Sequence, residues 1–423
     1  MKRIRQMLCM MMMVSQFGAA QSPTAASADV SRGAQSLAAA RQAITEKPGE
    51  YTGYNLLATA LVRRAQATSD VGLYRQAAEA VKQSLQLAPN NFDAEKIQVL
   101  ILLGEHEYPA ALELATALNK RLPDDVMVYG WLTDANVELG NYKDAEVAAQ
   151  WMLDLRPGNL PALTRAAHLR ELFGDAEGAY ELIEMAFQST PATETADRAA
   201  LLKVMGRLRL ATGSPEKAEQ FFQRALTTFP SDPAALGNLA QLRITERRYG
   251  EAVELLQQRD QALPQAGNLL DLAEALQLAG RDTEARKAFA DFETKALAES
   301  NSKNDSNREL VFYYADHAHQ PAKALDLAKR EYAWRHDVYT LDAYAWALHS
   351  NGQDAEARKQ IEIALAVGIR DSRIFEHAGE IALKSGDRAA AQQYLQAAVS
   401  LHAVGSDPAQ LMLSQILGPN AQR

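Results

Sequence analysis

Asp316-His317-Ala-His319 is the segment of this sequence whose residue types most directly suggest chemistry. Imidazole and carboxylate groups bind divalent metals, and a convincing site needs three such donors. Residues two apart on a helix point to different sides, so His317 and His319 could share one ion only in a turn. Pro321 favours a turn here, and His349 could join from a neighbouring unit. With only two firm donors, we expect a polar turn and no metal.

The sequence carries no motif of a known catalytic class. It has no Gly-rich phosphate loop, no His-Glu-x-x-His, no Gly-x-Ser-x-Gly and no paired cysteines. Acidic residues are abundant, but on helix surfaces they usually face solvent or pair with Lys or Arg four residues away. We therefore expect neither an enzyme nor a bound cofactor.

Composition points to a folded, helical chain. Of 423 residues, 47% are hydrophobic, which is enough for a large buried core. Aromatic residues make up only 7% and β-branched residues are scarce, so a β-sandwich or barrel is disfavoured. The net charge of −9 would repel nucleic acid and an anionic bilayer surface, so neither is an expected partner.

The first twenty residues have the organisation of a secretory signal. Lys2, Arg3 and Arg5 precede a short apolar run, and small residues end at Ala20. The run is too short for a membrane-spanning helix, and Cys9 is misplaced for lipidation. We expect cleavage after Ala20, a periplasmic protein without cysteine, and no membrane insertion after cleavage. An uncleaved anchor is the alternative. The Ala- and Ser-rich residues 21–30 would form a flexible lead.

A period of about 34 residues organises the rest of the chain. Small residues recur at the start of every second expected helix, with spacings of 33, 34 or 39 residues: Ala77, Ala111, Ala145, Ala179, Ala218, Ala252, Ala285, Ala324, Ala357 and Ala391. Glycines, such as Gly140 and Gly174, mark tight turns, and prolines end many second helices. The repeating unit is therefore a helix, a turn and a second helix.

These units resemble the tetratricopeptide repeat. The clearest unit, residues 126–159, matches the family pattern at the following positions: Leu132, Thr133, Gly140, Tyr142, Ala145, Ala149 and Pro157. The resemblance covers about residues 35–405 and implies an all-α, right-handed superhelical solenoid of about ten helix pairs. Phe312 departs from the pattern, because the family places a small residue there so that the two helices pack closely. The alanines listed above would be the repeat-packing residues.

The positions of the repeats predict two arrays of helix pairs and a covering helix at each end of the solenoid. A leading half-unit and the first seven units form a front array, residues 31–299, and three units form a back array, residues 305–405. The polar residues 300–304 between them would be a linker or hinge. A solenoid needs polar-faced ends, so residues 406–423 would supply a capping helix and tail.

The resemblance also implies a binding groove, because first helices line the concave surface in this family. In the back array it would bring together aromatic and polar side chains: Tyr313, Asp316, His317, Tyr339, Asp342, Trp346 and His349. Such a mixture suits a peptide or a small ligand. The alternative is that Tyr339 and Trp346 merely pack the helices. Further forward, Lys203 and Arg207 lie one turn apart and could clamp a partner's carboxylate.

Three function classes remain open on these grounds. We expect a periplasmic scaffold that binds a protein or peptide partner in its groove and supports assembly of a cell-envelope complex. The alternative is an accessory protein that binds a small ligand or metal ion through the last three repeats. An enzyme would need an unsuspected site. A homodimer through the end caps would be compatible with the scaffold.

Overall fold

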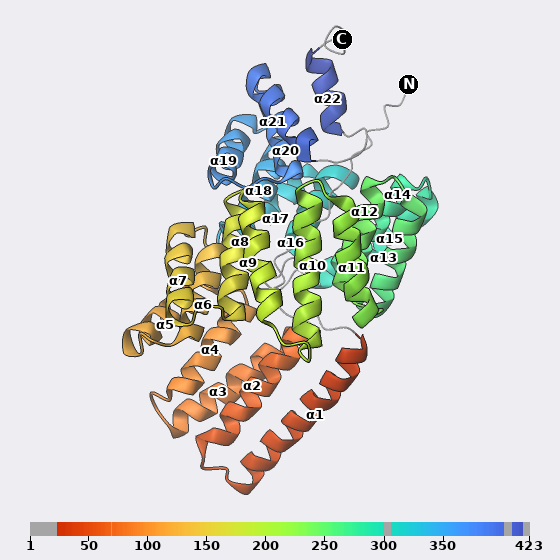
Figure 1. Ribbon diagram of the computed structural model, residues 1–423. Helices are drawn as coiled ribbons and strands as arrows, with labels where there is room; N and C mark the ends of the chain where they lie inside the picture. The colour runs from red at the N-terminus through yellow and green to blue at the C-terminus, as the bar shows by residue number, and fades with distance from the viewer. Residues whose placement is uncertain (1–22, 69, 300–305, 402–407, 418–423) are drawn as a thin grey trace.

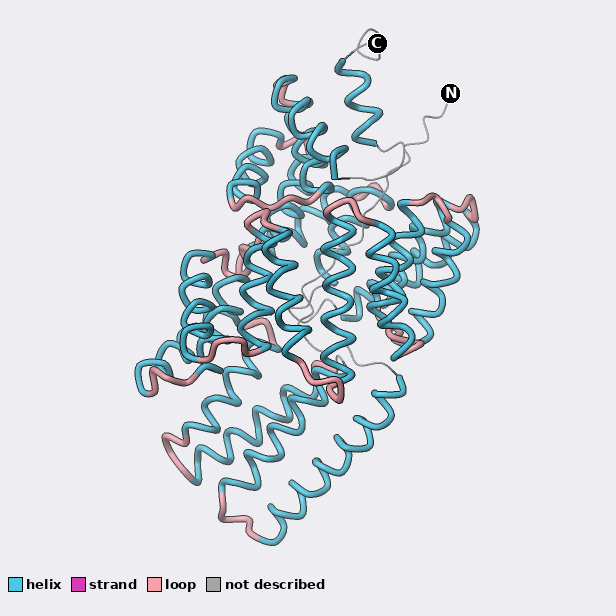
Figure 2. Tube along the Cα trace, viewed as in Figure 1, coloured by secondary structure: helices cyan, strands magenta, loops and turns pink. Residues whose placement is uncertain are grey.

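The computed structural model describes residues 23–68, 70–299, 306–401 and 408–417, and within these ranges the chain is helical, with no β-strand. Figure 1 shows the helices and Figure 2 the short loops between them. The helices are α1 (Pro23–Glu46), α2 (Tyr51–Thr68), α3 (Gly72–Leu87), α4 (Phe92–Gly104), α5 (Tyr108–Arg121), α6 (Val126–Glu138), α7 (Tyr142–Leu155), α8 (Leu160–Leu172), α9 (Ala176–Ser189), α10 (Thr195–Ala211), α11 (Pro215–Thr228), α12 (Pro233–Thr245), α13 (Tyr249–Ala262), α14 (Ala266–Leu278), α15 (Asp282–Glu299), α16 (Ser306–Phe312), α17 (Pro321–Tyr332), α18 (Val338–Ser350), α19 (Asp354–Ala366), α20 (Ser372–Lys384), α21 (Arg388–Leu401) and α22 (Pro408–Leu417).

Helices α2 to α21 follow one another as pairs, so the predicted all-α solenoid is confirmed. Asn or Asp residues cap six of the first helices, where their side-chain oxygens accept hydrogen bonds from backbone N–H groups of the first turn: Asn91, Asp125, Asn159, Asp232, Asp337 and Asp371. The turn inside most pairs contains a glycine with positive φ, such as Gly140 at 74°. In three pairs that lack this glycine, His106, Arg247 and His319 adopt the left-handed conformation instead.

Small residues let the paired helices approach one another. The ten alanines of the repeat register are all buried, with at most 2% of each exposed. At the small position of the first helix, a side chain on Gly206 would collide with Phe222, because its Cβ would lie 2.4 Å from the ring. Stability therefore accumulates between neighbouring helices, and each pair covers the apolar face of the next.

The pair that begins the back array departs from this regularity. Phe312 is buried at the position where the other units have smaller residues. Directly after it, Tyr313–His317 forms one wide helical turn, in which the N–H of Ala318 donates to the carbonyl oxygen of Tyr313 at 2.9 Å. The guanidinium of Arg373 lies 3.4 Å from the centre of the Phe312 ring. The wide turn accommodates a bulky side chain where the helices would otherwise touch.

The two arrays meet, and this contact is the main feature that positions the site. The turn between α6 and α7 lies against the connection between α17 and α18, where the N–H of His336 donates to the carbonyl oxygen of Glu138 at 3.0 Å. The turn between α8 and α9 lies equally close to the α19–α20 connection, since a Cβ on Gly174 would be 2.5 Å from the carbonyl oxygen of Gly368. One hydrophobic cluster joins residues of α6, α7 and α8 to the back array. In Figure 1 the light-blue helix α18 accordingly lies beside the yellow helix α8.

The ends of the solenoid are covered as the repeat register predicts. Helix α1 packs on α2 through Leu37, and α22 packs on α21 through Ala409 and Met412. Helix α1 begins at Pro23, so most of the segment expected to be a flexible lead is helical. Alanine is the strongest helix former and proline is tolerated in a first turn, which explains this correction.

Two further expectations fall on residues outside the described ranges: the signal peptide, residues 1–20, and the linker or hinge, residues 300–304. Within the described ranges, no helix combines the length and the apolar character needed to cross a bilayer.

Candidate functional site

Trp346 and Asp342 on α18 are buried rather than exposed to a groove. Their exposed fractions are 4% and 1%. The indole N–H of Trp346 donates to Asp316 at 2.8 Å, and Asp342 lies 2.7 Å from Nδ1 of His377 on α20. The Trp346 and His377 rings stack with their centres 4.1 Å apart. These two residues hold the first helices of consecutive units together. They therefore pack the helices against one another and do not line an open groove.

Asp316 is part of the same interior cluster. Burial raises the pKa of its carboxyl group, while the charge of His377 and the hydrogen bond from Trp346 oppose that shift. The cluster is therefore a set of mutually satisfied polar groups inside the protein, which rigidifies the packing of three helices.

Tyr313 and His317 lie on the wide turn and face the front array. The hydroxyl of Tyr313 donates to Glu293 at 3.3 Å, and burial, followed by the charge of Glu293, raises the pKa of Tyr313 to about 12. Nε2 of His317 lies 3.2 Å from a carboxylate oxygen of Glu274 on α14, and its ring lies 4.4 Å from that of Phe289. Both side chains therefore join the last pair of the front array to the first pair of the back array.

The three histidines considered for a metal site do not come together. His317 is held by Glu274, whereas Nδ1 of His349 lies 2.6 Å from Asp354. His319 is exposed in the turn before Pro321. Within the described part of the chain, no group of three His, Cys, Asp or Glu side chains is arranged to hold an ion. The segment is built as a polar turn.

The surroundings of His349 nevertheless change its pKa. Burial disfavours its imidazolium form, but hydrogen bonds with Glu380 and Asp354 outweigh that penalty and raise the pKa of His349. Tyr339, at the start of the same helix, lies in the field of Glu171, Asp371 and Arg207, and burial raises the pKa of its hydroxyl. Residues of the front array thus surround the beginning of α18.

The expected carboxylate clamp is already occupied by the protein itself. Both carboxylate oxygens of Asp232 accept from the ammonium of Lys203, at 2.9 and 3.1 Å. The guanidinium of Arg207 forms a two-pronged ion pair with Glu171, and although burial opposes it, this charge lowers the pKa of Glu171. Lys203 and Arg207, which were predicted to grip a partner's carboxylate, are thus each paired with a carboxylate of a neighbouring helix pair in this structure.

A buried ionic network closes the contact between the arrays. Asp337, which caps α18, receives Arg308 at 3.2 Å and Arg335 at 2.9 Å. Arg335 also reaches Glu138 of α6 at 2.5 Å. Asp337 keeps a lowered pKa because the charges of Arg335 and Arg308 outweigh its burial. Removing one partner from such a buried network leaves an uncompensated charge, so the network fixes the position of α18 against α6.

An open cleft of about 560 Å³ lies beside this contact, where the α8–α9 turn faces the last two pairs. Its walls come from both arrays: Phe173, Gly174, Glu362, Leu365, Ala366, Gly368, Ile369, Arg370, Phe375 and Tyr394. The rings of Phe375 and Tyr394 stack with centres 6.5 Å apart. Arg370 is exposed and forms no ion pair with any residue the structure describes. The cleft thus combines aromatic surface with one available cation, which suits an apolar side chain near a carboxylate.

Sequence analysis missed this cleft because it forms where one unit meets units five and six further along the chain. The repeat register predicts which helices are neighbours, but it does not predict how tightly the superhelix winds. Gly174 and Gly368 offered one signal, since each glycine allows a close backbone approach.

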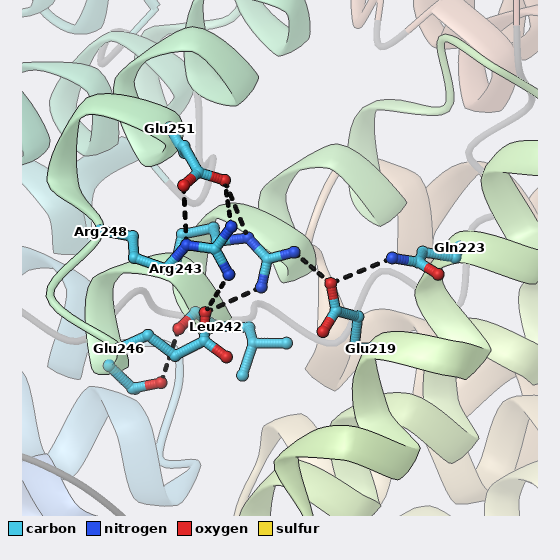
Figure 3. Close-up of polar contacts among 8 residues, drawn as sticks. Glu219, Gln223, Leu242, Arg243, Glu246, Arg248 and Glu251 are labelled. Carbon is cyan, nitrogen blue, oxygen red and sulfur yellow. Dashed lines mark hydrogen bonds and ion pairs between the residues drawn. The ribbon is translucent and has the colours of Figure 1, made fainter.

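The front array contains a second dense polar network, between α11, α12 and α13 (Figure 3). Arg243 is nearly buried and pairs with Glu219 of α11, with Glu246 at 2.8 Å and with Glu251 of α13 at 3.5 Å. Arg248 adds bonds to Glu251 and Glu246. All these charges are satisfied within the protein, so the network joins neighbouring pairs and offers no free group for catalysis.

This same region matches the sequence profile of the tetratricopeptide repeat family, over residues 209–269. Residues 209–269 therefore carry tetratricopeptide repeats. The match spans α11, α12 and α13, and the same helix-turn-helix unit recurs on both sides of it.

Comparison with known proteins shows which sequences and solved structures the chain resembles. The chain is 36% identical over 107 residues to cellulose synthase operon protein C of Xanthomonas axonopodis pv. citri, a match that covers 25% of this chain and 7% of that protein. Among solved structures it is similar to PilW, a type IV pilus biogenesis factor, with a TM-score of 0.42, 16% identity and coverage of 49% of this chain and 94% of PilW. It is also similar to yeast Tom70, with a TM-score of 0.41, 12% identity and coverage of 92% of both chains.

Proposed function

We propose that this protein is a tetratricopeptide-repeat scaffold that binds a protein or peptide partner in the cleft between its two arrays. The observation that carries the proposal is Arg370, an exposed cation without an ion-pair partner among the described residues, at the edge of an aromatic cleft. A peptide that presents an apolar side chain to Phe173 and Phe375 and a carboxylate to Arg370 would fit this chemistry.

The cleft replaces the groove as the proposed site because the side chains expected to line the groove are engaged with one another. Trp346 and Asp342 are buried, and Arg207 is paired with Glu171. A partner in the groove would have to break these contacts, whereas a partner in the cleft would add contacts to an exposed surface. We propose binding rather than catalysis for the same reason, since the interior polar groups satisfy each other.

We also propose that the protein works in the cell envelope, exported to the periplasm by residues 1–20. The basic, apolar and small-residue regions of that segment support export. The relative named as a cellulose synthase operon protein supports a role in assembling an envelope complex. Identification of the N-terminal residue of protein recovered from the periplasm tests export directly: Gln21 is expected, and an intact Met1 would indicate an uncleaved anchor.

The binding proposal is tested by capture of envelope proteins on the immobilised protein, with quantification by mass spectrometry. Arg370→Glu reverses the charge at the cleft and is expected to abolish recovery of the partner. Arg63→Glu is the matched control, because Arg63 is also exposed but lies on α2, far from the cleft along the solenoid. Equal recovery with both variants would contradict the cleft as the binding site.

A further inference from the structure

The second helices of the repeats share one equivalent position, the sixth residue after the register alanine, and it is exposed in nine of the ten units. Most units place a polar residue or alanine there: Gln83, Ala117, Arg224, Gln258, Asp291, Arg330 and Ala397. Three units instead carry a large apolar side chain that is about half exposed, namely Trp151 at 49%, Met185 at 51% and Ile363 at 51%. Two of these, Trp151 and Met185, belong to consecutive units.

Trp151, Met185 and Val147 are exposed apolar side chains on second helices of consecutive units. Helices α7 and α9 are the second helices of consecutive units and both pack on α8, which lies between them in the chain. The equivalent register therefore presents Trp151 and Met185 on the same outer side. Val147 lies one turn before Trp151 on that side and is 58% exposed. We call these three residues the convex patch.

Packing within the chain accounts for only part of the convex patch. The ring of Trp151 stacks on Tyr129 with centres 5.9 Å apart, which shields Tyr129. Half of the indole and more than half of Val147 remain in water, where large apolar side chains gain nothing for folding. Contiguous exposed apolar side chains with a polar rim are typical of interaction surfaces.

The helices that carry the convex patch are predominantly acidic. Helices α7 and α9 together carry six carboxylates and a single cation, Lys143: the acids are Asp144, Glu146, Asp154, Glu177, Glu181 and Glu184. Of these, Glu177 is paired with Arg209 at 2.8 Å. Around Ile363 the charges balance instead, because Arg358 and Lys359 pair with Glu362 and Glu356 on the same helix.

We propose that the convex patch docks a cationic amphipathic helix of a partner protein. Leu or Phe side chains on one face of that helix would cover Trp151, Val147 and Met185, and its Lys and Arg residues would meet the carboxylates of α7 and α9. An anionic membrane surface has the wrong charge for these acidic helices. The convex patch shares no residue with the cleft, so a scaffold with both surfaces would join two partners.

A synthetic 18-residue helix of Leu and Lys, with Leu repeating at helical spacing, is the probe for this surface. Its binding to the purified protein is measured by calorimetry and by acrylamide quenching of tryptophan fluorescence. Trp131 and Trp346 are buried, Trp334 is partly buried and Trp151 is about half exposed, so Trp151 is the most accessible reporter. We expect binding that shields Trp151 and weakens as salt is added. Trp151→Ala and Met185→Ala should each weaken it about tenfold, and Glu181→Lys with Glu184→Lys more strongly.

Matched controls separate docking from general effects. Ile363→Ala removes the same register position from a unit with balanced charge and should leave the affinity unchanged. Met185→Ala keeps the Trp151–Tyr129 contact, so its effect cannot come from lost stacking. The proposal is overturned if a scrambled Leu/Lys peptide binds equally well, if the double variant Trp151→Ala with Met185→Ala binds as tightly as the parent, or if sedimentation shows a dimer that Trp151→Ala dissociates, which would assign the surface to a second copy of this chain.

Discussion

The hydroxyl oxygen of Tyr142 accepts a hydrogen bond from the backbone N–H of Val338 at 2.9 Å, between residues 196 positions apart. Tyr142 opens α7 in the front array and Val338 opens α18 in the back array. The first N–H groups of a helix have no partner within the helix, so α18 receives one of its caps from a distant repeat. Repeat proteins usually have contacts only between neighbours, whereas this chain is also closed across the superhelix.

Removing that hydroxyl should loosen the closure. In Tyr142→Phe the buried N–H of Val338 loses its acceptor, which should cost about 1–3 kcal/mol of unfolding free energy. Urea unfolding followed by circular dichroism measures this loss. Tyr249→Phe is the control, because Tyr249 also stands three residues before a register alanine. An equal loss in both variants would contradict a special role for Tyr142.

A comparison of alanine variants at Gly140 and Gly213 distinguishes the effect of backbone strain from the effect of contact between the arrays. Both have a φ of 74°, so Ala at either position suffers the same conformational penalty. Only at Gly140 would the new Cβ meet the back array, 2.8 Å from the carbonyl oxygen of His336. Gly140→Ala should therefore speed hydrogen exchange at the amides of His336 and Val338, while Gly213→Ala leaves these amides protected. Mass spectrometry of exchanged peptides that cover residues 333–342 gives the readout.

Asp342→Ala combined with Trp346→Ala should lower the melting temperature substantially. Both side chains are buried, and truncation of a buried Trp alone typically costs about 3–5 kcal/mol. His377 would lose its carboxylate and its stacked ring at once. Thermal unfolding monitored by circular dichroism measures the effect. A variant with an unchanged melting temperature would instead place these residues on an exposed groove.

Asp271 should make stability depend on pH. Burial, with an added contribution from Glu274 and opposition from Arg259, raises the pKa of Asp271 to about 6. The pKa of such a carboxyl group is higher in the folded protein than in the unfolded chain. Its contribution to the free energy of unfolding is fully present below the pKa of the unfolded chain, and it is lost as the pH rises through the pKa of the folded protein. Asp271→Asn should therefore gain stability relative to the parent between pH 4 and pH 7, by up to about 3 kcal/mol. Asp326→Asn, at an exposed site, should show no such trend in the same urea titrations.

The sequence was sufficient to predict the repeats, and insufficient to predict their closure. The alanine spacing and the turn glycines reflect contacts between adjacent helices, which every unit makes in the same way. Phe312 was a visible departure, and the wide turn follows it directly. In contrast, Tyr142 looks like any family residue at its turn, and nothing in its local pattern indicates a bond to Val338. The burial of Trp346 and the pairing of Arg207 depend on that long-range geometry as well.

Closure of the solenoid is the central claim, and a designed disulfide tests it most directly. A Cβ on Gly140 would lie 3.4 Å from Cβ of His336, close to the separation that a disulfide needs. In a Cys9→Ser background, Gly140→Cys with His336→Cys should oxidise to an intramolecular disulfide, seen by non-reducing electrophoresis and peptide mapping. Gly213→Cys with His336→Cys should not. Free thiols or only intermolecular links in the first pair would contradict the closed solenoid.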